Sequence, residues 1–148
     1  MKLAHYIRVR VLSNSEEDIK IVESNLRDFF PFNIEDEKLK LNINTVKGVK
    51  DNKITIMEIE LKKDSHTTKF LKNLTSKLDI EQKKIIIGQL DSRIDEGNHI
   101  YIRLDKEKLL NNEFKITDEG NCFHIVICLA CFPSTLKNAK KLATEIFK

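Results

Sequence analysis

Glycine is scarce in this chain of 148 residues, which contains only four. A loop that cradles phosphate groups needs several closely spaced glycines, so the sequence lacks the residues for a P-loop or a dinucleotide-binding fingerprint. Long apolar runs are absent too, since the longest extends from Phe123 to Phe132 and is interrupted by His124. A run of this length is far too short to span a bilayer, and we expect no membrane partner.

Cysteine is also sparse, and its three copies cannot all pair within the chain. Arg8 and Arg10 stand where a secretion signal would need its apolar stretch. Nothing therefore indicates an oxidising compartment, and we expect a cytoplasmic protein with free thiols.

The most metal-like group in the sequence is Cys122, His124, Cys128 and Cys131. Zinc needs four ligands that converge tetrahedrally, and a Cys-x-x-Cys pair usually supplies two of them from a tight turn. Here the pair lies inside an apolar strand pattern, where Cys128 and Cys131 would point to opposite faces. The pattern favours small buried thiols over a zinc or redox site, and we expect no metal and no cofactor.

Length and composition indicate one globular domain, residues 1–148, with 41% hydrophobic and 33% charged residues. The net charge is only +3 but is unevenly spread, with seven lysines from Lys62 to Lys84 and eight acidic residues from Ser13 to Glu37. A molecule with a basic side and an acidic side can orient an anionic partner. Lysine-rich helices with ordinary solvated faces are the alternative explanation.

Apolar periodicity predicts strands and helices along the whole chain. Strands are expected at 3–12, 38–47, 53–62, 98–104, 113–117 and 122–132, with turn residues Gly48 and Asp51-Asn52 between the second and third. Helices are expected from an N-cap at Ser15 to Pro31, from a cap at Asp64 or Ser65, from an Asp79–Gln82 capping box to Gly97, at 105–110, and after Pro133 and Ser134.

This order of elements is not a strict βαβ alternation. We expect an α+β fold with a mixed, mostly antiparallel sheet and helices packed largely on one face. The strand at 122–132 is apolar on both faces. That pattern predicts a central strand that is covered on both sides, and the segment 113–117 is expected to form a hairpin with it.

The tripeptide Tyr-Ile-Arg occurs twice in strands that alternate apolar and polar residues. The first strand has Tyr6, Arg8 and Arg10 on its polar face, and the second has Tyr101 and Arg103 on its own. Tyrosine can stack on a base and arginine can pair with a phosphate, so a sheet that contains both strands could carry an RNA-binding face. A solvated face with ordinary cross-strand pairs explains the same pattern without RNA.

Lysines on the polar side of the second predicted helix, which also carries His66, and lysines after the second Tyr-Ile-Arg copy would extend this face. Lysine contacts with phosphates give salt-sensitive affinity with little sequence preference. Glu58 and Glu60 are alternative partners for the arginines across the sheet. The candidate RNA-binding residues are Tyr6, Arg8, Arg10, Lys62, Lys63, Lys69, Lys72, Tyr101, Arg103 and Lys106.

No catalytic constellation is evident in the sequence. The four histidines are dispersed, which is typical of structural or surface groups. Asp91, Asp95 and Glu96 follow helix spacing, and we expect them to pair with Arg93 or nearby lysines rather than to act as acids or bases. The sequence therefore favours a binding protein over an enzyme.

Three of these stretches, residues 5–10, 97–106 and 117–121, resemble the signature stretches of a family of small archaeal RNA-binding proteins. Members of that family are predicted accessory proteins of the RNA-degrading exosome, with a fold similar to that of the ribosomal protein that binds 5S rRNA. The resemblance implies RNA, and the exosome or other RNA-processing proteins, as partners. The segment Cys131-Phe132-Pro133 departs from the family's Ala-Tyr-Pro pattern and lacks its hydroxyl.

Two functions from different classes remain open at this point. The first is a non-catalytic protein that contacts structured RNA through a Tyr/Arg sheet face and a Lys-rich helix, as an accessory factor in RNA processing or degradation. The second is a protein–protein assembly module of a larger complex without direct RNA contact. We expect a monomer or a homodimer, and an edge strand of the 38–62 hairpin is the candidate dimer contact.

Overall fold

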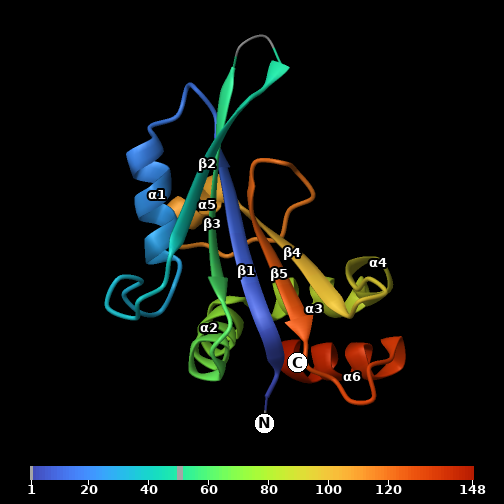
Figure 1. Cartoon of the computed structure of the whole chain (residues 1–148). Helices are drawn as coiled ribbons and strands as arrows, with labels where there is room; N and C mark the ends of the chain where they lie inside the picture. The colour runs from blue at the N-terminus through green and yellow to red at the C-terminus, as the bar shows by residue number, and fades with distance from the viewer. Residues whose placement is uncertain (1, 50–51) are drawn as a thin grey trace.

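The computed structural model describes residues 2–49 and 52–148, and its centre is one sheet with the strand order β2-β3-β1-β5-β4 (Figure 1). Every pairing between neighbouring strands is antiparallel. The strands are β1 (Ala4–Ser13), β2 (Leu41–Lys47), β3 (Lys53–Leu61), β4 (His99–Asp105) and β5 (Cys122–Leu129). The helices are α1 (Ile19–Asp28), α2 (Asp64–Lys77), α3 (Ile80–Gly88), α4 (Leu90–Arg93), α5 (Lys106–Leu110) and α6 (Leu136–Phe147).

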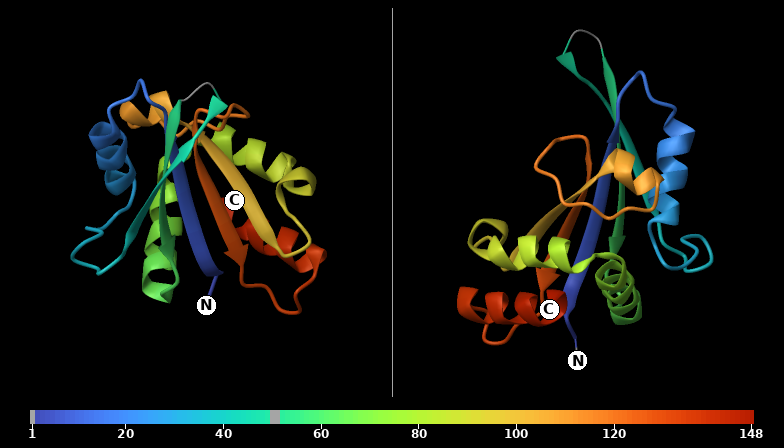
Figure 2. Two further views of the ribbon diagram at one scale, coloured as in Figure 1. Left: turned by 45° about the horizontal axis from the view of Figure 1, so that its top comes forward. Right: turned by 180° about the vertical axis from the view of Figure 1, so that it is seen from behind.

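The helices gather on one side of the sheet. Seen from behind, α2, α3 and α6 lie in front of the strands, while the opposite face of the sheet carries no helix (Figure 2). We name this uncovered side the open face. The arrangement confirms the predicted α+β class with helices on one face.

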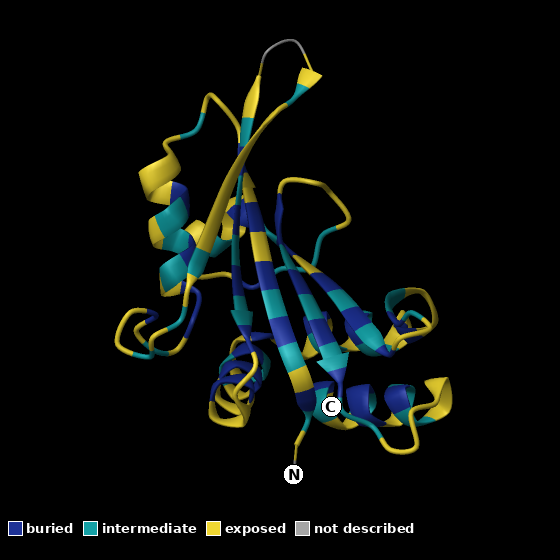
Figure 3. Ribbon diagram, in the orientation of Figure 1, coloured by how far each residue is buried: buried dark blue, intermediate teal, exposed yellow. Residues whose placement is uncertain are grey.

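Residues along each inner strand alternate between the core and the open face (Figure 3). In β1, Ile7 and Val9 are fully buried beneath the helices, while the intervening Arg8 is only half-buried. In β3, Met57 and Ile59 are likewise fully buried. This alternation follows from the two-residue period of a strand, which sends successive side chains to opposite sides of the sheet.

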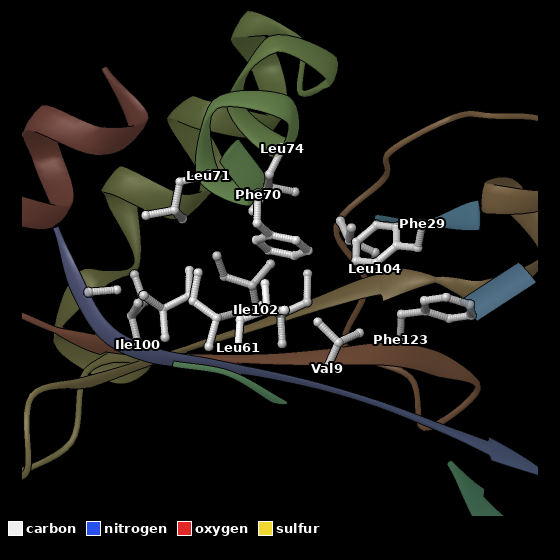
Figure 4. Close-up of a cluster of buried hydrophobic side chains, with 14 of the residues drawn as sticks. Val9, Phe29, Leu61, Phe70, Leu71, Leu74, Ile100, Ile102, Leu104 and Phe123 are labelled. Carbon is white, nitrogen blue, oxygen red and sulfur yellow. The ribbon is translucent and has the colours of Figure 1, made fainter. Parts of the chain in front are cut away.

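The core lies between the sheet and α2. Phe70, Leu71 and Leu74 of α2 project onto buried strand residues such as Leu61 and Ile102 (Figure 4). At one end of this layer the Phe29 ring lies 5.4–5.6 Å from the rings of three other phenylalanines, in edge-on or stacked arrangements: Phe70, Phe114 and Phe123. Burial of these apolar groups stabilises the fold, because each fully buried side chain contributes about 2 kcal/mol to the free energy of folding.

The first helix begins later than the sequence predicts. Ser15 is not its N-cap, because the side chain of Asn14 accepts hydrogen bonds from the following N–H groups and forms a separate turn. Asp18 caps α1 instead and accepts from the Lys20 N–H at 2.9 Å. Ile19 therefore sits in the first turn of the helix and is 45% exposed, although its spacing predicts a core position.

The second helix lacks its predicted cap. Lys63 occupies the N-cap position without a side-chain cap bond, and Asp64 and Ser65 lie within the first turn. His66, expected on the polar side with the lysines, is buried, and its ring centroid lies 5.1 Å from that of Phe32. The tertiary contact with Phe32 outweighs the local amphipathic pattern.

The third predicted helix is divided into two. Asp79 caps α3 as predicted, but the helix ends at Gly88 and does not continue to Gly97. Ile94 leaves the helical path and forms a β-bridge with Ile100. A glycine inside a helix weakens it, and Ile94 gains a buried position beside the sheet.

The predicted hairpin between 113–117 and the last strand is wrong. The Thr117 N–H donates to the Arg103 carbonyl at 3.0 Å, so this segment lies along the outer edge of β4 and not beside β5. β5 is an inner strand, as predicted, but no second layer covers its other face. The hairpin of β2 and β3 is present, and its predicted turn residue Asp51 lies outside the described residues.

Candidate nucleic-acid interface

Both tyrosines and four of the five arginines of the chain line the open face or its β4 edge. β5 separates β1 from β4, and the antiparallel register aligns side chains in rows about 7 Å apart across the three strands. The rows are Arg10–His124–Arg103, Arg8–Val126–Tyr101 and Tyr6–Cys128–His99. We name the following set the aromatic–arginine face: Tyr6, Arg8, Arg10, His99, Tyr101, Arg103 and His124.

A chain of hydrogen bonds joins the two tyrosines at one end of this face. The Tyr6 hydroxyl lies 2.7 Å from His99 Nε2, and His99 Nδ1 lies 3.0 Å from Asp95 Oδ1. The Tyr101 hydroxyl donates to Asp95 Oδ2 at 2.6 Å. These bonds fix the orientation of both phenol rings before any ligand binds.

The same bonds set the ionisation of Asp95 and Tyr101. Desolvation by itself raises the pKa of Asp95, but hydrogen bonds from Tyr101 and from the N–H and ring of His99 lower it to about 2. The bond to Asp95 in turn raises the pKa of Tyr101. At neutral pH the pair therefore consists of a carboxylate and a neutral phenol.

Replacing Asp95 with Asn should make folding stability less dependent on acidic pH. Because its folded-state pKa of about 2 lies below the ordinary value of 3.8, the carboxylate stabilises the fold above about pH 4 and loses this effect as the pH falls. The side chain is 38% exposed, so solvent screening reduces the expected loss in Asp95→Asn to about 1 kcal/mol near neutral pH. Urea denaturation at about pH 6 and about pH 2.5 would measure it. An equal loss at both pH values would contradict this assignment.

Two acidic residues of β3 hold the β1 arginines. Arg8 Nε lies 3.2 Å from Glu58 Oε1 and 3.8 Å from Glu60 Oε2, and Arg10 Nη2 lies 3.1 Å from Glu58 Oε2. The Arg8 guanidinium also lies 5.1 Å from the centroid of the Tyr6 ring, within cation–π range. The cross-strand pairing that the sequence left open is therefore present, and it orients the arginines without burying them.

On the β4 side of the face, two rings stack. The centroids of Tyr101 and His124 are 5.9 Å apart with an interplanar angle of 17°. Burial lowers the pKa of His124, and the nearby Arg103 and Arg10 lower it further. A neutral imidazole offers a flat π-surface beside the phenol, which suits stacking against a base.

Two adjoining pockets lie over the aromatic–arginine face and share Tyr101 and His124. One, of about 350 Å³, lies over the three rows. The other, of about 460 Å³, lies between the β4 edge and α4, and we name it the β4-edge pocket. It is lined by Gln89, Arg93, Tyr101, Arg103, Asp118 and His124, with Ser92 and Thr117 beside them.

The predicted lysines do not all join this surface. Lys62 lies at its margin, 3.8 Å from Glu60 Oε1, and Lys63 follows at the start of α2. Lys69 and Lys72 are exposed on α2, which covers the other side of the sheet (Figures 1 and 2). The Tyr/Arg face and the Lys-rich helix are therefore two surfaces and not one.

Lys106 lies away from the aromatic–arginine face, which the sequence predicts it to extend. Its side chain is 8% exposed, and Nζ donates to the Leu12 carbonyl at 2.6 Å and to Glu17 Oε1 at 2.8 Å. Burial raises the pKa of Glu17, but hydrogen bonds from Lys106 and Asn14 and the charge of Lys106 lower it overall. Lys106 ties α5 to the loop that follows β1.

Sequence reasoning missed several residues of this site. Arg93 was expected to pair with nearby acids, but its Nη1 donates to the Tyr101 carbonyl at 3.1 Å. Asp95 was expected to pair with Arg93 or lysines, and it binds Tyr101 and His99 instead. His124 could have been found, because it alternates with Phe123 and Ile125 and so faces away from the core.

The three cysteines are free thiols that differ in burial. Cys122 is buried and Cys128 and Cys131 are half-buried, all as free thiols, and burial raises the pKa values of Cys122 and Cys128. Among residues 2–49 and 52–148, no group of three or more His, Cys, Asp or Glu side chains could hold a metal ion. No helix in these ranges is long and apolar enough to cross a membrane.

Several archaeal proteins resemble this chain in sequence and structure. The RNA-binding protein PAB1135 of Pyrococcus abyssi is 29% identical over 142 residues, which are 96% of this chain and 92% of that protein. The crystal structure of protein AF2318 from Archaeglobus fulgidus is 31% identical with a TM-score of 0.84, and the match covers 97% of this chain and 99% of that one. Mth689, a DUF54 protein from Methanothermobacter thermautotrophicus, shares the fold with a TM-score of 0.79 at 22% identity over 99% of both chains.

A family model described as RNA binding matches residues 6–129. This span contains the whole aromatic–arginine face, from Tyr6 on β1 to His124 on β5. The chain belongs to this RNA-binding family.

Proposed function

We propose that the protein binds RNA without catalysis through the aromatic–arginine face. The observation that carries the proposal is the register that places Tyr6, Arg8 and Arg10 on the same open face as Tyr101 and Arg103, with β5 between the two strands. Arginine forms planar, bidentate contacts with phosphate, and oriented aromatic rings stack on bases. The fold supplies both kinds of group on a rigid sheet.

The acidic partners Glu58 and Glu60 give this face a particular character. They hold Arg8 and Arg10 in place, and they add negative charge that opposes indiscriminate attraction of polyanions. A phosphate that enters the face must therefore compete with a carboxylate. This competition favours RNA whose shape also engages the rings over any polyanion.

Lysines act around this face rather than within it. Lys62 and Lys63 contact an RNA strand that extends past the end of β3. Lys69 and Lys72 of α2 attract RNA only through long-range electrostatics. Structured RNA that extends past the sheet would be attracted by both pairs of lysines. An accessory role in RNA processing or degradation, with the exosome as a candidate partner, is consistent with such a non-catalytic binder.

Fluorescence anisotropy with labelled RNA should show binding that weakens steeply with salt. Micromolar or tighter affinity is expected. Three arginine–phosphate contacts would give a slope of about −2 in log affinity against log salt for single-stranded RNA. Titrations of duplex and single-stranded RNA at two salt concentrations test this. Absence of binding to either RNA at low salt would reject the proposal.

One observation favours a protein assembly module as the second candidate. β2 is an edge strand with a free hydrogen-bonding side, and Ile43 and Val46 on it are exposed. Such an edge can pair with a strand of another chain or of a second copy. Complex formation that is insensitive to both salt and nuclease treatment would favour this function over RNA binding.

A further inference from the structure

The β4-edge pocket is an open hollow between the outer edge of β4 and α4. Its volume of about 460 Å³ lies in the range of pockets that hold small ligands. Three kinds of group line it: the stacked rings of Tyr101 and His124, the guanidinium groups of Arg93 and Arg103, and the polar side chains of Gln89 and Asp118.

The rings select for a base that is not already stacked. Tyr101 is held by its bond to Asp95, and His124 lies almost parallel to it at 17°. In a continuous duplex the faces of each base are covered by its neighbours, so these rings have no base face to contact. A single unpaired nucleotide can place its base in the pocket.

The two arginines of the pocket have different roles: Arg93 is bonded within the protein, and Arg103 is an exposed cation. Arg93 donates to the Tyr101 carbonyl at 3.1 Å and to Gln89 Oε1 at 2.5 Å, which ties α4 to β4. Arg103 is exposed and donates to the Asp118 carbonyl at 3.3 Å. Its remaining donors face solvent and can bind the phosphate that flanks an inserted base.

Asp118 is the acidic residue that lines the pocket, and it is exposed. In the described part of the chain its carboxylate has no hydrogen-bond or salt-bridge partner, because Arg103 contacts only its carbonyl oxygen. An ionised carboxylate only accepts hydrogen bonds. Guanine is the base whose Watson–Crick edge carries two neighbouring donors, N1–H and N2–H₂, and these match the two oxygens of a carboxylate.

We propose that the β4-edge pocket holds one unpaired guanine of the bound RNA. The base stacks on the outer face of the Tyr101–His124 pair, its N1–H and N2–H₂ donate to the Asp118 carboxylate, and Arg103 binds the adjacent phosphate. The inference rests on the proposed RNA-binding function and adds to it a preference for an unpaired nucleotide and for one base.

The test compares a perfect RNA duplex with the same duplex that carries one bulged guanosine, adenosine, cytidine or uridine. The guanosine bulge should bind about tenfold more tightly than the perfect duplex and than the other bulges, the discrimination typical of a bidentate contact. Asp118→Asn should abolish the difference among the four bulges, while its loss of a negative charge raises the affinity for the perfect duplex and for all four bulged duplexes alike. Asp36→Asn, which removes the same charge from an exposed loop between α1 and β2, should preserve the guanosine preference.

The outcomes separate this inference from the function on which it rests. Equal affinity for all five RNAs would overturn the unpaired-guanine site and leave RNA binding standing. Equal affinity for the four bulges, each above the perfect duplex, would overturn the guanine assignment. Absence of binding between the unaltered protein and any of the five RNAs would overturn the proposed function itself. Thermal unfolding of Asp118→Asn with an unchanged midpoint excludes misfolding as the cause of its effect.

Discussion

Replacing Arg8 and Arg103 together with alanine is expected to weaken RNA binding about 100-fold, since each arginine would lose a charge-assisted hydrogen bond to phosphate. The two residues approach from β1 and β4, on opposite sides of β5. The slope of log affinity against log salt should become less steep by about 1.4, because each lost contact with single-stranded RNA contributes about 0.7. Anisotropy titrations of the unaltered protein and the variant at several salt concentrations measure both effects.

The fold should survive this double substitution. Arg8 is on the open face with 35% of its side chain exposed, and Arg103 is exposed, so neither contributes to the core between the sheet and α2. Lys69→Ala with Lys72→Ala is the matched control, because it removes the same two charges from α2 on the other side of the sheet. This pair should change affinity less than about threefold, as expected for long-range attraction alone. A loss from the lysine pair as large as that from the arginine pair would refute the aromatic–arginine face as the site.

The membership of each sheet face could be predicted from the sequence, because it depends only on local alternation. Tyr6, Arg8 and Arg10 share a face for the same reason that Ile7 and Val9 share the other. Their alignment with Tyr101 and Arg103 has a different origin. It requires β5 to lie between β1 and β4, and that pairing depends on contacts between segments far apart in the chain.

Caps and helix boundaries show the same limit. Asp79 was correctly predicted as the cap of α3, since the cap and its partner Gln82 are three residues apart. The break after Gly88 was not, because Ile94 leaves the helix for a bridge to Ile100 at the edge of the sheet. His66 was assigned to the polar side of its helix, yet the ring of Phe32, from a distant loop, covers it. In both wrong predictions, the helix end and His66, a tertiary contact outweighed the local pattern.

Among the candidate site residues, Lys106 differs most from its predicted exposure. Lysine is almost never buried without a partner, so its position after Tyr101 and Arg103 predicted an exposed extension of the binding face. The partner is Glu17, which lies 89 residues earlier in the chain. Only the folded topology brings α5 beside the loop after β1, and no local pattern signals that pairing.

Replacing Lys106 with methionine should therefore destabilise the fold by about 2 kcal/mol, because it removes the bond to the Leu12 carbonyl and an ion pair in which the Glu17 side chain is 30% exposed. Methionine keeps the length and apolar character of the side-chain stem, so the loss isolates the charge and the bond to the Leu12 carbonyl. Affinity for RNA should stay within about twofold of the unaltered value, since Nζ does not reach the open face. Urea denaturation and anisotropy on the same variant measure the two quantities.

The pH dependence of that loss identifies its cause. The folded-state pKa of Glu17 is lowered, so its pairing stabilises the fold above the unfolded-state pKa and this effect disappears as the pH falls through the folded-state value. The difference between Lys106→Met and the unaltered protein should shrink in acid. Glu17→Gln combined with Lys106→Met should cost less than the sum of the two single changes, because the two side chains are in direct contact. If Lys106→Met instead kept its stability and lost RNA affinity, Lys106 would be an RNA-contacting residue.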